Sequence, residues 1–160
     1  MLHLLGVADE HIRLIEDEDW TYQEGPQIIT VRRLGDWTVA IEDHGWRGAR
    51  RKVMEALSRD GGEAVAVLRH DYAQDHLAHA VDGHVTTDIN PAYPIDRQGT
   101  DPDGLNRHLR DLGIDPAADD SIDNPIPMAL ALATRITGVL ITPDDLRRPV
   151  LGAAIPGALH

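Results

Sequence analysis

The residues best suited to chemistry are histidines, which gather with aspartates in the middle of the chain. Nine histidines occur in 160 residues. Four of them lie close together in sequence: His70, His76, His79 and His84. If the chain turns at Asp82-Gly83, His79 and His84 become diagonal neighbours on a hairpin, about 7–8 Å apart between Cα atoms. Asp88 or Asp75 then adds a carboxylate at longer reach.

Imidazole with carboxylate is a donor set for zinc, nickel or iron. However, the histidines show neither an HxH nor an HxxxH spacing, and a sheet surface that faces solvent can carry histidines without binding anything. We favour that simpler interpretation over a metal site at His79, His84 and Asp88, and we expect no cofactor.

Acid–base catalysis is a second option, because a buried carboxylate can act as a general base. Asp71 beside His70 and Glu42 beside the loop of Trp46 are the candidates. No nucleophile accompanies them: cysteine is absent, and the serines are Ser58 and Ser121. No G-x-S-x-G, HExxH, P-loop or dinucleotide-binding motif occurs. The catalytic residues are therefore unknown, and the sequence leans towards a protein that is not an enzyme.

The turn from Glu42 to Arg47 is a candidate binding surface. Tryptophan and arginine are enriched in interface hot spots, so Trp46 and Arg47 could anchor a partner. The structural alternative, which we favour, is that Trp46 folds over the sheet edge. Arg69 and Arg32 on neighbouring strands could bind an anion, although exposed ion pairs are the simpler expectation.

Charge limits the classes of partner. The formal net charge is −12, with 27 acidic and 15 basic residues. Such a surface repels phosphate backbones, so nucleic-acid binding is not expected. Acidic runs at residues 16–19 and 115–123 suit a basic protein partner, or nucleic-acid mimicry, or solubility alone. A homodimer is a further option.

The elements that position these residues follow from hydrophobic patterning. Alternating or β-branched runs predict strands, and apolar residues at helical spacing predict helices. We expect strands at residues 27–33, 37–43, 63–70, 75–80 and 84–90. We expect helices at residues 49–58, 101–113 and 124–137, and a short one after Thr142-Pro143. Residues 8–15 are ambiguous and could form a short helix. Residues 91–99 are predicted as a loop, and residues 150–155 as an apolar tail docked on the body.

The element order β-β-α-β-β-β-α-α-α predicts an α+β fold, with a roughly five-stranded antiparallel sheet backed by helices. The length fits a single domain over residues 1–160, in which residues 1–26 are a segment of uncertain structure and residues 27–155 form the core. Around the Asp82-Gly83 turn, we expect Ala78, Ala80, Val85, Thr87 and Ile89 to point inward with His76. We expect His79, His84, Asp88 and Leu77 on the opposite, mostly polar face.

No run approaches the ~20 apolar residues of a membrane span, and the first residues lack the pattern of a signal peptide. With no cysteine in the chain, these features favour a cytoplasmic protein without a membrane partner.

Leu34–Glu42 (LGDWTVAIE) and Gly45–Gly48 (GWRG) resemble the signature of an uncharacterised actinobacterial family, abundant in Streptomyces-type genomes. The resemblance spans roughly residues 28 to 155 and supports the fold, but it implies no established activity. Members of that family tend to carry aromatic residues around the last hairpin, where this chain has His79 and Asp88. That departure implies either a changed pocket or sequence drift without a functional consequence.

Two functions follow as expectations. The first is a non-catalytic acidic interaction or accessory protein, immunity-like or partner-binding, from an actinobacterium. The alternative is a small enzyme or ligand-binding protein of specialised metabolism that uses a His/Asp-rich sheet face or a cavity.

Overall fold

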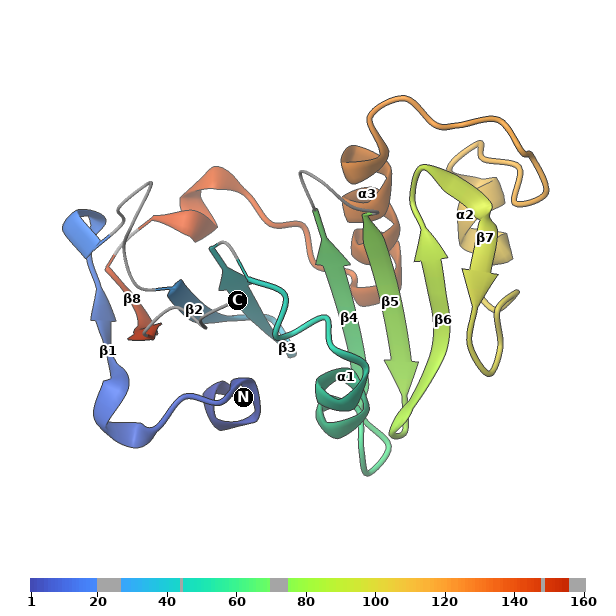
Figure 1. Ribbon diagram of the computed structural model, residues 1–160. Helices are drawn as coiled ribbons and strands as arrows, with labels where there is room; N and C mark the ends of the chain where they lie inside the picture. Colours follow the sequence, from blue (N-terminus) through green and yellow to red (C-terminus); the bar gives the residue numbers. More distant parts are fainter. Residues whose placement is uncertain (20–26, 44, 70–74, 148, 156–160) are drawn as a thin grey trace. The chain divides into compact units, whose positions relative to one another are not determined.

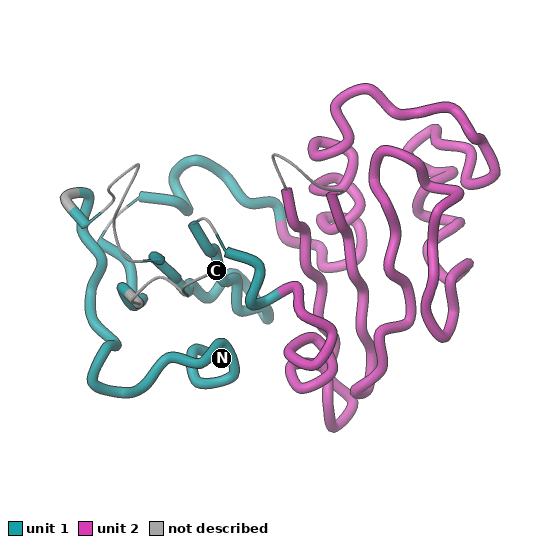
Figure 2. Tube along the Cα trace, in the orientation of Figure 1, with its two compact units in different colours: residues 1–48, 140–160 teal, residues 49–139 magenta. Residues whose placement is uncertain are grey.

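The computed structural model describes residues 1–19, 27–43, 45–69, 75–147 and 149–155 (Figure 1). The chain divides into two compact units (Figure 2). Unit 1 comprises residues 1–48 and 140–160, and unit 2 comprises residues 49–139. The expected single domain stays a prediction, and each unit is described by itself. His70 and Asp71 lie outside the described residues.

Among the described residues, eight strands form two antiparallel sheets of four strands each. The strands are β1 (Ile12–Ile15), β2 (Gln27–Leu34), β3 (Trp37–Glu42), β4 (Glu63–Leu68), β5 (His76–Val81), β6 (His84–Asn90), β7 (Tyr93–Gln98) and β8 (Val150–Ile155). The helices are α1 (Arg51–Leu57), α2 (Asn106–Asp111) and α3 (Pro125–Thr137). Short 3₁₀ turns are η1 (Leu2–Leu5), η2 (Asp9–His11), η3 (Asp17–Asp19) and η4 (Pro143–Leu146). The predicted α+β class is confirmed.

The sheet of unit 1 has the order β1-β8-β2-β3. Strands β2 and β3 form the predicted hairpin, in which Leu34 lies opposite Trp37. Strand β8 comes from the far end of the chain and lies between β1 and β2. The apolar tail is therefore a central strand, and its Ala153 is fully buried. Residues 12–15 are a strand as well, and the 3₁₀ turn η2 precedes them, so the short helix that residues 8–15 could have formed is not present.

The sheet of unit 2 has the order β4-β5-β6-β7, so each strand pairs with its neighbour in sequence. Val81 lies opposite His84, and Asp82 and Gly83 both have positive φ, 48° and 79°. These angles suit the two-residue turn that the Asp-Gly pair predicts. Residues 93–98 form β7 at the sheet edge. The loop expected over residues 91–99 was therefore wrong in its central part.

Helices cover both faces of this second sheet (Figure 1). On one face, Met54 of α1 packs with small residues of β4, β5 and β6. On the other face, Leu132 of α3 and Leu109 of α2 pack against Leu77 and Ile89. All four of these leucine and isoleucine side chains are at most 1% exposed. Unit 2 is thus a three-layer arrangement with its sheet in the middle.

A shift in register changes which residues of the β5–β6 hairpin face inward together. Ala80 lies opposite Val85, but His79 lies opposite Thr87, so Thr86 is an extra residue on β6. A bulge of this kind reverses the alternation of side chains beyond it. Thr87 and Ile89 therefore face the α3 side, whereas Ala78, Ala80 and Val85 face α1. The single inward face that we expected was wrong, and Leu77, expected on the polar face, is fully buried.

Candidate functional site

The predicted metal ligands lie on two faces of the β5–β6 hairpin. His79 and His84 share one face, and Asp88, which lies opposite Ala78, is on the other. His79 Nε2 lies 2.6 Å from Glu63 Oε1, and His84 Nδ1 lies 2.9 Å from the Asp82 carbonyl oxygen. The structure does not bring the three together. No group of three or more side chains suited to a metal occurs among the described residues.

The Glu42–Arg47 turn is held by its own side chains. The carboxylate of Glu42 accepts hydrogen bonds from the backbone N–H of Arg47 (2.8 Å) and of Gly48 (2.5 Å). Arg47 Nε donates to Gln27 Oε1 at 3.0 Å. A Cβ atom at Gly45 would lie 1.7 Å from Gln27 Nε2, so a larger residue there would displace the Gln27 side chain. Glu42 and Arg47 therefore shape the turn.

The other two predicted binding residues belong to different units. Trp46 is 50% exposed at the turn in unit 1, whereas Arg69 follows β4 in unit 2. A role of these residues in binding a partner stays a prediction.

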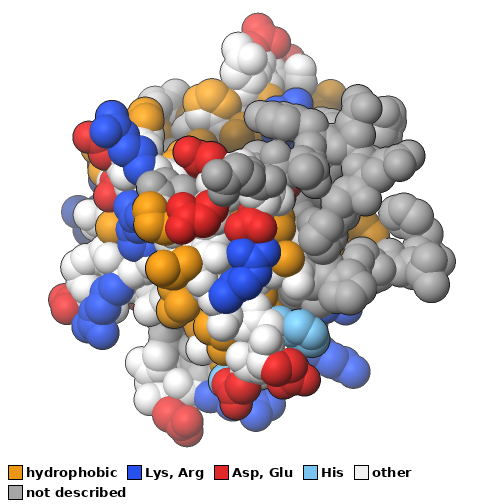
Figure 3. Space-filling view, turned by 90° about the vertical axis from the view of Figure 1, so that its left-hand side faces the viewer, with side chains coloured by type: hydrophobic (Ala, Val, Ile, Leu, Met, Phe, Trp, Pro, Cys, Tyr) orange, Lys and Arg blue, Asp and Glu red, His pale blue; other side chains and the backbone are white. Residues whose placement is uncertain are grey.

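Charge in unit 2 is unevenly distributed along the chain. Residues 82–124 carry ten acidic and three basic residues, a net charge of −7. The rest of unit 2, residues 49–81 and 125–139, carries five acidic and six basic residues. Seven exposed aspartates on α2 and its flanking loops form what we call the acidic cap: Asp101, Asp103, Asp111, Asp115, Asp119, Asp120 and Asp123. On the face that Figure 3 shows, side chains of both charges are mixed with apolar ones.

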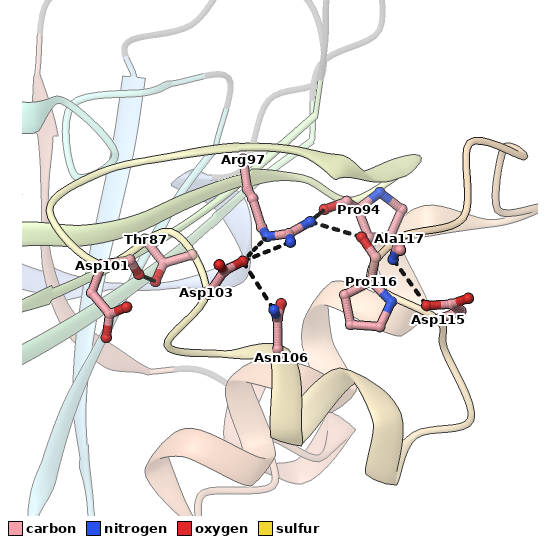
Figure 4. A network of polar contacts seen from close by, with 9 residues as sticks. All are labelled: Thr87, Pro94, Arg97, Asp101, Asp103, Asn106, Asp115, Pro116 and Ala117. Carbon is pink, nitrogen blue, oxygen red and sulfur yellow. Dashed lines mark hydrogen bonds and ion pairs between the residues drawn. The ribbon is translucent and has the colours of Figure 1, made fainter.

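Arg97 at the end of β7 ties the segments of the acidic cap together (Figure 4). Its Nη1 donates to the carbonyl oxygens of Pro94 (2.9 Å) and Pro116 (2.7 Å). Its Nε and Nη2 both donate to Asp103 Oδ1, at 2.9 and 2.6 Å. The Arg97 side chain is only 16% exposed. One largely buried cation therefore joins β7, the loop before α2 and the start of the loop after α2.

Local hydrogen bonds order the same loops further. Asn106 Nδ2 donates to Asp103 Oδ1 at 2.9 Å, and the backbone N–H of Ala117 donates to Asp115 Oδ1 at 2.9 Å. The N–H of Ile122 donates to the carbonyl of Ala92 at 2.8 Å. The carboxylates of the cap are thus presented on loops with defined conformations.

Most carboxylates of the cap lack a neutralising partner. Hydrogen bonds from Arg97, and then from Asn106, hold the pKa of Asp103 below its usual range, so that carboxyl is ionised at neutral pH. Asp111 pairs with Arg135. The other five aspartates of the cap form no ion pair with the described residues. Five exposed carboxylates of the acidic cap are therefore available to a cation.

A smaller polar group lies on the face of the unit 2 sheet that packs against α1. His76 Nδ1 is 3.2 Å from Asp88 Oδ1, and Gln98 Nε2 donates to Asp88 Oδ2 at 3.3 Å. Asp88 also lines a cleft of about 70 Å³ together with Arg51 and Met54 of α1. A histidine held by a carboxylate can accept a proton, although nothing in this group supplies a nucleophile.

Sequence reasoning found the acidic run at residues 115–123 but missed Arg97 and Asp103. A signal was present, because Arg97 is the sole lysine or arginine between Arg69 and Arg107. A single cation inside an acidic segment is a candidate for a structural role.

Among the described residues, no helix is long and apolar enough to cross a membrane. The model of a family of unknown function, DUF6461, matches residues 4–154. The chain therefore belongs to that family. No curated protein matches this chain, and no solved structure matches it.

Proposed function

We propose that this member of the DUF6461 family is a non-catalytic interaction protein that binds a basic protein partner through the acidic cap. In this proposal it serves as an accessory or immunity-like protein in the cytoplasm of an actinobacterium. The actinobacterial source rests on the sequence resemblance alone.

The observation that supports the proposal most is a set of exposed carboxylates without ion pairs on loops that hydrogen bonds hold. Five aspartates of the cap have no ion pair with described residues, and Arg97 holds the loops on which they sit. A preordered charged surface loses less conformational entropy on binding than a flexible one. Complementary charge also accelerates encounter with a basic partner.

The test is capture of partners by the full chain from a lysate of its source organism, at physiological salt. The cap variant replaces four aspartates by asparagine: Asp115→Asn, Asp119→Asn, Asp120→Asn and Asp123→Asn. The control variant removes four exposed carboxylates elsewhere: Glu10→Gln, Glu16→Gln, Asp36→Asn and Asp60→Asn. Both variants have the same net charge, so a general charge effect changes both equally.

We expect a recurrent basic partner to bind the wild type and the control variant and to be lost with the cap variant. Binding should weaken as salt rises, because the Debye length is about 8 Å at 0.15 M ionic strength and shorter above it. A partner that the cap variant retains, or the absence of any partner in repeated captures, contradicts the proposal.

The second candidate is a small enzyme or ligand-binding protein of specialised metabolism. The His76–Asp88–Gln98 group beside the cleft on α1 favours it. A thermal-shift screen with metal salts and small metabolites tests this function. Stabilisation that disappears in His76→Gln and persists in His11→Gln, at an exposed site, supports it; no stabilisation by any compound sets it aside.

A further inference from the structure

A cleft with apolar walls lies on one face of the sheet of unit 1. Its volume is about 120 Å³. The aliphatic side chains that line it come from β2, β3, β8 and the segment before β8: Leu34, Val39, Ile41, Ile141, Leu146 and Val150. An apolar cavity of about 150 Å³ in another protein takes up benzene, so this cleft has room for a small aliphatic group.

The cleft also has a polar end, formed by Thr30, Arg32 and Asp145. Arg32 Nη2 donates to the carbonyl oxygen of Arg147 at 2.8 Å, and Nη1 donates to that of Asp144 at 3.3 Å. These bonds use two of the five N–H groups of the guanidinium. Within the described chain, the other three have no acceptor. The guanidinium of Arg32 is therefore held in place, and three of its N–H groups remain available to a ligand.

Asp145 supplies a fixed negative charge at the same end. Its Oδ2 accepts hydrogen bonds from the hydroxyl (2.7 Å) and the backbone N–H (2.9 Å) of Thr142. These bonds lower the pKa of Asp145, with a smaller contribution from Arg32, so the carboxyl is ionised at neutral pH. Its second oxygen accepts no hydrogen bond from the described residues.

Thr30 adds a polar group that the fold does not use. The residue lines the cleft, and its hydroxyl makes no hydrogen bond with any residue that the structure describes. A ligand in the cleft, or water in its absence, would supply the missing bond.

We propose that this cleft binds an aliphatic α-amino acid about the size of valine or leucine. The carboxylate faces Arg32 and Thr30, the ammonium faces Asp145, and the side chain lies against the aliphatic walls. A ligand with one charge would meet one attractive and one repulsive or unpaired group, whereas a zwitterion satisfies both. This site lies in unit 1 and is independent of the acidic cap.

The first experiment is calorimetric titration of the full chain with L-leucine and with two analogues that each lack one charge. The analogues are 4-methylpentanoate, which lacks the ammonium, and 3-methylbutylamine, which lacks the carboxylate. Because hydrogen bonds to charged groups contribute strongly, we expect each analogue to bind roughly tenfold more weakly than leucine, or worse. No binding of leucine at millimolar concentration, or equal binding of either analogue, overturns the proposal.

The second experiment measures leucine binding by variants of the cleft residues, to test whether the ligand lies in the cleft. Arg32→Met should weaken leucine binding by about tenfold or more, whereas Arg33→Met should not, because Arg33 lies opposite Thr38 on the other face of the sheet. Since Arg32 also bonds the segment before β8, a second variant is needed. Val39→Phe fills the cleft and leaves both charges in place, so it should abolish binding while circular dichroism stays unchanged. Leucine bound equally by folded Val39→Phe, or equal losses in the two arginine variants, refutes the assignment.

Discussion

Replacing Arg97 by methionine removes the cation that joins the loops of unit 2 and keeps most of its apolar stem. Four hydrogen bonds are lost. Two go to Asp103, whose side chain is 67% exposed, and two go to the carbonyl oxygens of Pro94 and Pro116. The pair with Asp103 is exposed and contributes little. The stabilisation therefore comes mainly from the two carbonyl bonds.

Hydrogen bonds from a charged donor contribute about 1.5–3 kcal/mol each. Pro94 and Pro116 are both less than 2% exposed, so we expect the loss of the two carbonyl bonds in Arg97→Met to lower the free energy of unfolding by about 3–6 kcal/mol. That is a large share of the 5–15 kcal/mol that stabilises a typical domain. Arg97→Lys should recover little, because one ammonium group cannot reproduce the planar fork of the guanidinium.

The assay is urea denaturation, with hydrogen exchange at the amide of Ile122, which bonds across the loops that Arg97 secures. We expect faster exchange there in Arg97→Met. Asp103→Asn is the control and should change stability much less. If Asp103→Asn destabilises as much as Arg97→Met, or if Arg97→Met unfolds like the wild type, Arg97 does not organise this region through the carbonyls.

Three further predictions concern the core, a turn and pH. Leu132 is fully buried and Leu130 is 49% exposed on the same helix, so Leu132→Ala should cost about 2–5 kcal/mol in urea denaturation and Leu130→Ala within about 0.5 kcal/mol. Gly99 has φ of 130°, and a Cβ atom there would lie 2.1 Å from the carbonyl oxygen of Thr86; Gly99→Ala should therefore lower the thermal midpoint markedly, and an unchanged midpoint would refute the clash. The pKa of Asp145 is lowered in the folded state, so its stabilisation is present above the ordinary Asp pKa of about 3.9 and is lost as pH falls through the folded value. Urea midpoints measured from pH 5 downward should fall less steeply in Asp145→Asn, and parallel curves would contradict this.

Local chemistry explains the features that the sequence predicted well. The Asp82-Gly83 turn needs positive φ at two adjacent residues, and that demand is met within the pair itself. Helix α3 begins at Pro125 and ends before Gly138, which has φ of 71°, as its proline and glycine predict. The β2–β3 hairpin likewise forms between two strands that follow one another directly in the sequence. The α+β class follows from these elements.

Other features depend on contacts between distant segments. Residues 150–155 became a strand because β1 and β2 lie on either side of them, about 120 or more residues earlier in the chain. The extra residue Thr86 turned Ile89 towards α3, although strict alternation places it with Val85. Within the acidic segment, composition alone determined the charge, whereas the tertiary structure decided that Arg97 reaches two carbonyls and one carboxylate. Turns and caps are satisfied by adjacent residues, but register, sheet partners and side-chain bridges depend on packing over the whole unit.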